Sequence, residues 1–190
     1  MGTSASDITV ENIVGTIDSK RELDLDAIDE SMPGAEYDPV TFSGLLYTFD
    51  NPDVTVEIFR TGQIVCTGAR SRAELDYTAQ RLIEKLQDIG IHIDDYTEPS
   101  VENIVASTGF DTHVELSALA LDLGLENVEY EPEQFAALIY RPETVPFAVA
   151  LIFSNSKTVI LGCKSLTQVN EAVDIIEHKL TESVAVGTVY

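Results

Sequence analysis

The sequence is poor in basic residues, in cysteine and in long apolar runs. Of its 190 residues only 11 are Lys or Arg, and the two cysteines are Cys66 and Cys163. Two cysteines cannot build a disulfide framework or a four-cysteine zinc site. No apolar run approaches the roughly 18–20 residues of a membrane span, and the start MGTSASDITV has neither the basic nor the apolar segment of a secretory signal. We therefore expect a cytoplasmic protein that makes no membrane contact.

The acidic excess is the most unusual feature of the composition. Asp and Glu number 33, and the formal net charge is −22. A shortage of basic residues argues against nucleic acid, because phosphate contacts need a basic surface. Adaptation to molar intracellular salt gives the same composition, because the Debye length falls to roughly 3 Å at about 1 M and carboxylates no longer repel one another over distance. The acidic residues are spread through the chain, so we favour salt adaptation, which leaves the binding partner open.

An internal repeat determines the predicted architecture. The string VENIV occurs at 10–14 and at 101–105, and EYDPVTF at 36–42 returns as EYEPEQF at 129–135. Further matches follow in the same order, which indicates a tandem duplication and a pseudo-two-fold molecule. The predicted organisation is a first repeat at 8–94, a second repeat at 95–182, and flexible tails at 1–7 and 183–190.

Each repeat predicts an α+β unit of antiparallel strands with two helices on one side. The expected elements are a strand at 8–17, a helix at 24–31, and strands at 43–48, 54–60 and 63–67, with a strand at 100–108 and a helix at 115–123 opening the second repeat. Each repeat ends in a long helix behind a capping box, at 71–74 or 165–168. The helices carry apolar stripes, which are Leu75, Ala79, Leu82, Leu86 and Ile89 in the first and Val169, Val173, Ile176 and Leu180 in the second.

The strand at 149–153 predicts an apolar surface beyond the core. Val149, Leu151 and Phe153 share one face, while Ala150 and Ile152 share the other. Both faces are apolar, although each repeat has only enough helix to cover one of them. Either helices cover both faces, or one face is an apolar binding surface.

The repeated strings resemble the TATA-box-binding protein family of archaea and eukaryotes. The matching strings are VENIV, EYDPxxF, YEPExF, LIYR, IFRTG and IVCTGARS, and the resemblance extends from about residue 8 to residue 180. It implies a saddle, in which a curved antiparallel sheet of ten strands carries four helices on its convex side. The concave side would bind the minor groove of TATA-box promoter DNA, and proteins of this family are themselves the standard example of minor-groove wedging.

The resemblance also implies which residues contact DNA. The wedges would be Phe42 with Phe59 and Phe135 with Phe153. The groove floor would consist of Asn12, Val14, Val65, Thr67, Asn103, Val105, Leu151, Val159 and Leu161, with the two asparagines bonding to minor-groove acceptors. The phosphate contacts would be Arg70, Arg141, Lys157 and Lys164, although Arg70 and Lys164 fit equally well as solvated residues at a helix start.

The implied function is that of a general transcription initiation factor. It would bind double-stranded promoter DNA, receive transcription factor B at Glu131 and Glu133, and recruit RNA polymerase indirectly. The implied location is the nucleoid in an archaeal cytoplasm. No cofactor is implied, and a homodimer in the absence of DNA is compatible with the resemblance.

Several positions depart from the family pattern. Glu57 stands for an apolar residue on the DNA face, where a carboxylate would oppose base-edge acceptors. Thr41 and Thr48 replace arginines, Gln63 replaces a lysine, and Leu161 replaces the second central threonine. These departures favour an alternative function, namely a duplicated saddle-shaped protein-interaction module or a regulatory paralogue with weakened DNA binding.

Motifs for enzyme chemistry are missing or incomplete. His92, His113 and His178 have no metal-ligand spacing, so we expect surface residues and no metal site. The run at 162–165 resembles the end of a phosphate loop, but Thr158 and Cys163 stand where that motif needs glycine. We expect no catalytic residues and no enzyme activity.

Overall fold

The computed structural model describes residues 7–93, 95–110 and 114–187, so the prediction for His113 lies outside the described residues. The chain divides into two compact units. The first unit is Asn12–Glu102, and the second is Met1–Glu11 together with Asn103–Tyr190. The repeat boundaries at 8–94 and 95–182 stay a prediction, and α4 is helical as far as Gly187.

The first unit has five strands and two helices in its described part. They are β1 (Thr9–Asp18, which belongs to this unit from Asn12 on), α1 (Leu25–Ser31), β2 (Ala35–Glu36), β3 (Leu45–Asp50), β4 (Asp53–Ile58), β5 (Gln63–Ala69) and α2 (Arg72–Asp88). The strands lie in the order β2-β3-β4-β5-β1. Each pair of neighbouring strands in this order is antiparallel, and a tight turn at Gly62 joins β4 to β5.

The second unit repeats this plan. Its elements are β6 (Ser100–Thr108, which belongs to this unit from Asn103 on), α3 (Leu116–Leu123), β7 (Val128–Glu129), β8 (Leu138–Tyr140), β9 (Val149–Ile152), β10 (Thr158–Cys163) and α4 (Leu166–Gly187). The strand order is β6-β10-β9-β8-β7. The predicted α+β class, with ten antiparallel strands and four helices, is confirmed. The strands β2 and β7 are two residues long and leave no periodicity in the sequence, so only the structure reveals them.

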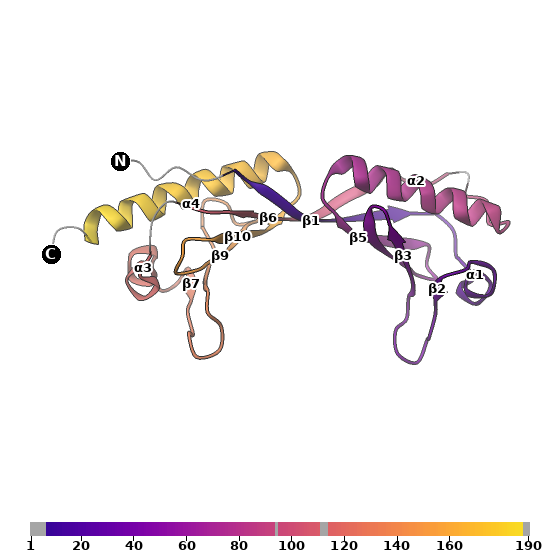
Figure 1. Cartoon of the computed structure of the whole chain (residues 1–190), viewed down its shortest axis with the longest axis horizontal. Coiled ribbons are helices and arrows are strands. Elements are labelled where there is room, and N and C mark those ends of the chain that lie inside the picture. The colour runs from indigo at the N-terminus through magenta and orange to yellow at the C-terminus, as the bar shows by residue number, and fades with distance from the viewer. Residues whose placement is uncertain (1–6, 94, 111–113, 188–190) are drawn as a thin grey trace. The chain divides into compact units, whose positions relative to one another are not determined.

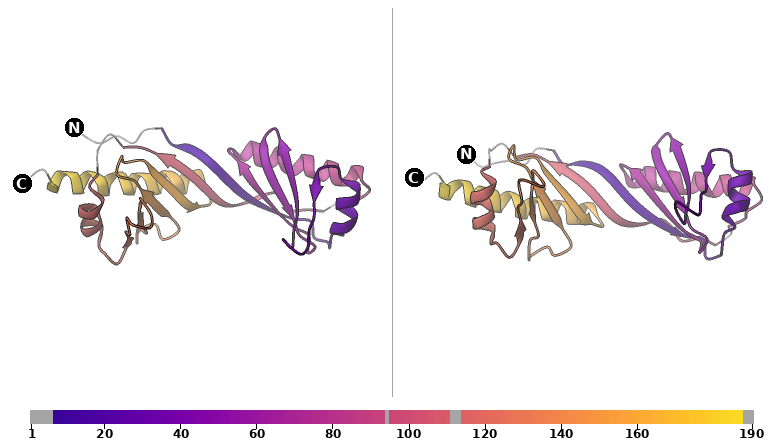
Figure 2. Two further views of the ribbon diagram at one scale, coloured as in Figure 1. Left: turned by 60° about the horizontal axis from the view of Figure 1, so that its bottom comes forward. Right: turned by 90° about the horizontal axis from the view of Figure 1, so that it is seen from below.

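One helix layer covers one face of the strands in each unit. The helix α2 packs on β5 and α4 packs on β10 (Figure 1), and the two rotated views in Figure 2 show the long helix of each unit on a single side of its strands. The predicted stripes are buried, except that Ile89 caps α2 and is half-buried. Burying one such side chain contributes about 1.5–3 kcal/mol, so these stripes fix the helices to the strands.

The capping boxes differ from the prediction by one residue. The hydroxyls of Ser71 and Ser165 accept the N–H of the residue three positions later, at 3.1 and 3.2 Å, as expected. The return bond, however, comes from the residue before the cap. Arg70 N–H donates to Glu74 at 2.8 Å, and Lys164 N–H donates to Gln168 at 2.7 Å. Each cap therefore fixes the backbone of a basic residue where a strand turns into a helix.

Two glycines interrupt the regular pairing of the central strands. Between Ile13 and Gly15 of β1 the partner strand β5 advances by three residues, from Ala69 to Cys66, and β10 likewise has an extra residue between Ile160 and Cys163, which indicates a bulge in β5 and another in β10. Gly68 (φ +116°) and Gly162 (φ +92°) lie in these bulges in the left-handed region. A Cβ at Gly68 would approach the carbonyl oxygen of Asp53 to 2.5 Å, and a Cβ at Gly162 would collide with that of Phe147. Only glycine fits either bulge.

We predict that Gly162→Ala destabilises the protein more than Gly90→Ala does. Gly90 has φ +86°, but a Cβ there would meet no atom within 4 Å, so the substitution carries only the left-handed backbone cost of about 1–2 kcal/mol. Gly162→Ala adds a collision with rigid backbone. Urea unfolding in molar KCl measures the difference, and equal losses of unfolding free energy would contradict the bulge.

Candidate nucleic-acid interface

Each unit leaves the face opposite its helices open. Along β1 the side chains of Ile13 and Ile17 are buried, while Asn12, Val14 and Thr16 alternate with them and are half-buried. The same alternation in β9 buries Ala150 and Ile152 and leaves the other face half-exposed. Of the two alternatives for the apolar strand at 149–153, the structure supports an uncovered face.

The open face of the first unit is built from two rows of paired side chains. In one row Leu46, Glu57, Val65 and Thr16 are successive partners across β3, β4, β5 and β1. In the other, Thr48 pairs with Thr55, and Thr55 pairs with Thr67. The hydroxyls of Thr48 and Thr55 are 3.1 Å apart. Glu57 therefore lies on the open face, on the same side of β4 as Thr55.

The open face of the second unit has the same pairing with more apolar residues. Ile139, Leu151, Val159 and Ser107 form the first row, in the places of Leu46, Glu57, Val65 and Thr16. Val149 pairs with Leu161 where the first unit has Thr55 and Thr67. The two units thus share one geometry but differ in polarity at three positions.

One asparagine bridges each bulge. Asn12 Oδ1 accepts the N–H of Gly68, and Asn103 Oδ1 accepts the N–H of Gly162, both at 2.7 Å. Because an N–H group must donate to an acceptor, the asparagine atom that faces the glycine N–H is the amide oxygen. The amide nitrogen is then the atom of the side chain that is left to face outward. In the first unit this nitrogen donates to Thr67 Oγ1 at 3.2 Å. In the second unit Leu161 has no hydroxyl to offer at that place.

An edge-to-face aromatic pair lies on each unit. The ring centroids of Phe42 and Phe59 are 5.8 Å apart at 70°, and those of Phe135 and Phe153 are 6.3 Å apart at 68°. Phe42 is 36% exposed and Phe135 44% exposed, although large aromatic side chains favour burial. The structure brings each predicted pair together, and the loops before β3 and β8 supply the more exposed member.

The four predicted phosphate contacts are exposed, but they are not alike. Arg141 Nη2 lies 3.3 Å from Glu129 Oε1, so this guanidinium already has an anionic partner. The backbone N–H groups of Arg70 and Lys164 are held by the helix caps, and that of Lys157 by Asn155 Oδ1 at 3.1 Å. Arg141 would have to exchange a carboxylate for a phosphate.

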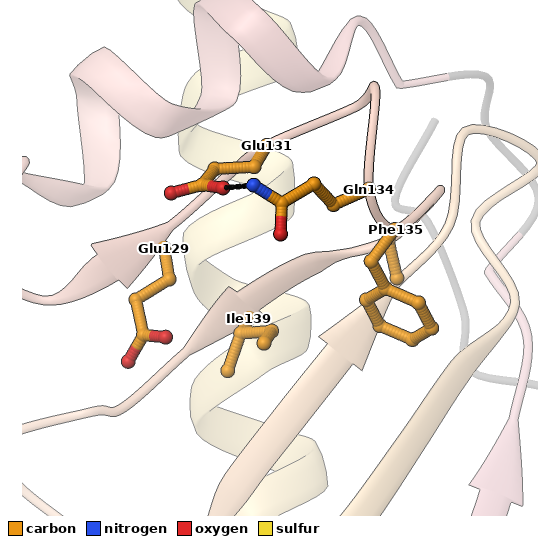
Figure 3. A pocket seen from close by; sticks show the side chains of 6 residues that line it. Glu129, Glu131, Gln134, Phe135 and Ile139 are labelled. Atoms are coloured by element: carbon orange, nitrogen blue, oxygen red, sulfur yellow. Dashed lines mark hydrogen bonds between the residues drawn. The ribbon is translucent and has the colours of Figure 1, made fainter.

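A hollow of about 290 Å³ lies beside Phe135 of the second unit (Figure 3). It is lined by Glu129, Glu131, Gln134, Phe135, Ala137 and Ile139. Gln134 donates a hydrogen bond to Glu131, shown dashed in Figure 3. The first unit has a hollow of about 440 Å³ at the corresponding place, and it includes Phe42, Thr41 and Asp38. Both hollows are acidic, and Glu131 and Glu133 are exposed.

The described residues hold no group of three or more His, Cys, Asp or Glu placed to bind a metal ion. None of the described helices has the length and apolar character needed to cross a bilayer. Cys66 and Cys163 are buried, and burial raises the pKa of the Cys66 thiol to about 12. A thiol that stays protonated is a poor nucleophile.

The family model for transcription factor TFIID, or TATA-binding protein, matches residues 7–89 and 98–183. The chain belongs to this family. It is 42% identical over 175 residues to the TATA-box-binding protein of Haloarcula marismortui, covering 92% of this chain and 94% of that one. It is 43% identical over 175 residues to TATA-box-binding protein 1 of Haloferax volcanii, covering 92% of each chain. The solved structure of Methanococcus jannaschii TBP matches with a TM-score of 0.83 at 34% identity, covering 93% of this chain and 99% of that chain.

Membership of the TATA-box-binding protein family confirms the predicted resemblance and fold class. The family consists of DNA-binding transcription factors and is not an enzyme family. Relatives from halophilic archaea agree with salt adaptation as the cause of the acidic composition.

Several hydrogen bonds of the open face are not predicted by the sequence pattern. The Thr16 hydroxyl donates a hydrogen bond to Glu102, and the Ser107 hydroxyl donates one to Glu11. The N–H groups of the two bulge glycines donate to the side-chain oxygens of the two asparagines. A signal for the first pair exists, because both hydroxyls lie four residues after the shared Asn of VENIV. The bonds themselves depend on strand register, which periodicity alone does not give.

We predict that Asn103→Leu destabilises the protein by about 1–3 kcal/mol, because Gly162 N–H loses its acceptor beneath an apolar side chain. Asn103→Asp is the matched control, since it keeps an oxygen at the same place and should retain most of the stability. Urea unfolding in molar KCl tests both variants. Equal losses would mean that the glycine N–H does not need the side-chain acceptor.

Proposed function

We propose that this protein is a general transcription initiation factor that binds the minor groove of TATA-box promoter DNA and bends it with phenylalanine wedges. The observation that carries the proposal is the pair of edge-to-face phenylalanines on the open face of each unit. Exposed rings at equivalent places in the two units do not contribute to a hydrophobic core, so they are available to a ligand. Apolar side chains inserted between base steps kink DNA towards the major groove.

The asparagines fit the chemistry of the groove floor. Adenine N3 and thymine O2 are acceptors, so an A·T-rich minor groove requires donors or apolar atoms opposite them. Asn12 and Asn103 direct their amide oxygens to glycine N–H groups, which leaves for base edges the amide nitrogen of Asn103 and the second amide hydrogen of Asn12, beside its bond to Thr67. Val14, Val65, Val105, Leu151 and Val159 are half-buried on the open face and supply the apolar contacts. Thr67 and Leu161 complete the floor.

The same proposal assigns the remaining partners. Arg70, Arg141, Lys157 and Lys164 contact phosphates, transcription factor B binds at Glu131 and Glu133, and RNA polymerase is recruited through that factor. The protein acts at the nucleoid of an archaeal cytoplasm. The open apolar faces are also available for a homodimer when DNA is absent.

A second candidate function is a protein-interaction module or regulatory paralogue with weakened DNA binding. It is favoured by Glu57 on the open face and by threonines at positions 41 and 48. Thr41 Oγ1 donates to Asp38 at 2.6 Å, so this position supplies neither a cation nor a free hydroxyl hydrogen.

We predict that replacing both phenylalanines of either pair with Ala reduces bending of an A·T-rich promoter duplex and weakens binding. Energy transfer between dyes at the duplex ends, in molar KCl, measures the bend. Tyr77→Ala is the control, because this aromatic is 47% exposed on α2, away from the open face. Wild-type bending in both double variants would refute the wedges, and no binding by the wild type would favour the interaction module.

We predict that Glu131→Lys with Glu133→Lys abolishes the complex of DNA, this protein and transcription factor B, while binary DNA binding stays equal or becomes stronger. Added cations favour phosphate but repel a basic partner surface. Glu36→Lys with Asp38→Lys makes the same change of charge on the first unit and should preserve the complex. A gel shift with and without the factor compares them. Survival of the complex in the first variant would exclude this site.

A further inference from the structure

Glu57 makes the two open faces chemically unequal. Its cross-strand partners are Leu46 and Val65, and those of Leu151 are Ile139 and Val159, so the two surroundings match. Thr55 and Thr67 add polarity to the same part of the first unit, where the second has Val149 and Leu161. A carboxylate with two hydroxyls nearby replaces an entirely apolar patch.

The Glu57 carboxylate has acceptor capacity to spare. No side chain of the described residues donates a hydrogen bond to it or forms an ion pair with it. It is half-buried at the next-to-last residue of β4, where strand alternation places Thr55 and Phe59 on the same face. An ionised carboxylate can only accept hydrogen bonds. A ligand that covers this position must therefore present a donor or leave a desolvated charge without a partner.

The minor groove of DNA offers one base-edge donor. A·T and T·A pairs present only the acceptors adenine N3 and thymine O2, whereas a G·C pair adds the guanine N2 amino group. An A·T pair against Glu57 would place a base-edge acceptor opposite the carboxylate, which is itself an acceptor. A guanine at that position would donate its amino hydrogen to the carboxylate.

We infer that Glu57 selects a guanine-containing base pair in the half of the binding site that the first unit covers. The inference rests on the proposed minor-groove function and extends it to sequence preference. The preferred DNA is therefore asymmetric, with A·T pairs against Leu151 of the second unit and one G·C pair against Glu57 of the first. One unpartnered acceptor on an otherwise matched surface thus sets both the sequence and the orientation of the site.

The test uses a set of duplexes that isolates the amino group. At each position of an A·T-rich site, the A·T pair is replaced in turn by G·C, by inosine·C and by 2,6-diaminopurine·T, in both strand orientations. Inosine·C lacks the minor-groove amino group of G·C, and diaminopurine·T adds that group to an A·T pair. In molar KCl we expect one position at which G·C and diaminopurine·T bind about tenfold more tightly than A·T and inosine·C, as one charge-assisted hydrogen bond would give.

Two variants assign the effect to the carboxylate. Glu57→Leu should remove the preference for the amino group and bind the all-A·T duplex more tightly than the wild type does. Leu151→Glu should create a second preference in the other half of the site. Urea unfolding verifies that each variant is folded, and Glu57→Leu decides the question if Leu151→Glu does not fold.

The outcomes separate this inference from the proposed function. Wild-type binding to the A·T duplex without an amino-group preference, or with a preference that survives in Glu57→Leu, would overturn the role of Glu57 and leave the proposed function standing. If the preference between duplexes changed with KCl concentration and not with the amino group, it would indicate a bound cation and would likewise overturn the role of Glu57. If the wild type bound none of the duplexes more tightly than a random competitor, both the role of Glu57 and the proposed function would be overturned.

Discussion

In both units the side-chain oxygen of one asparagine accepts the N–H of a left-handed glycine, and the open face depends on this bond. The bulge at Gly68 or Gly162 breaks the regular ladder and would leave an N–H without a strand partner. Asn12 and Asn103 supply the acceptor at 2.7 Å. The bond fixes the bulge and also fixes which end of the amide faces outward. A structural hydrogen bond thus determines the chemistry of the surface.

Duplication preserved this frame while the surfaces diverged. The cross-strand partners, the bulges and the helix caps recur in both units, because each holds strands and helix together, and the exposed aromatic pairs recur with them. Glu57 and Leu151 occupy equivalent places on the open face, where a side chain makes few core contacts. Such positions tolerate a change of polarity at little cost in stability, so a ligand is the main constraint on them. Unequal open faces are therefore what the proposed asymmetric DNA site would require.

Much of this fold is predictable from the sequence because a tandem repeat allows each element to be identified twice. The stripe from Leu75 to Leu86 and the alternation around Leu151 give the buried faces, since periods of 3.6 and 2 distinguish helix from strand. The strands β2 and β7 are too short for any period. The return bonds of the caps come from Arg70 and Lys164, one residue before the cap, and the sequence pattern does not distinguish these donors from the cap residues themselves. For the open face, the sequence yields the phenylalanine pairs through the resemblance. The acceptors of the glycine N–H groups depend on register and become visible only in the structure.

The scarcity of cations is compatible with a minor-groove ligand once the solvent is considered. Phosphate contacts gain their free energy by releasing counterions, and this gain falls as salt rises. At about 1 M salt the Debye length is roughly 3 Å, so both the attraction of lysines and the repulsion of a net charge of −22 are confined to direct contact. The proposed aromatic wedges and amide donors would act at contact distance and would keep their strength under these conditions. For the same reason Glu57 does not repel DNA at long range in molar salt. Its effect is the local cost of covering an unpartnered carboxylate, which depends on the base pair against it.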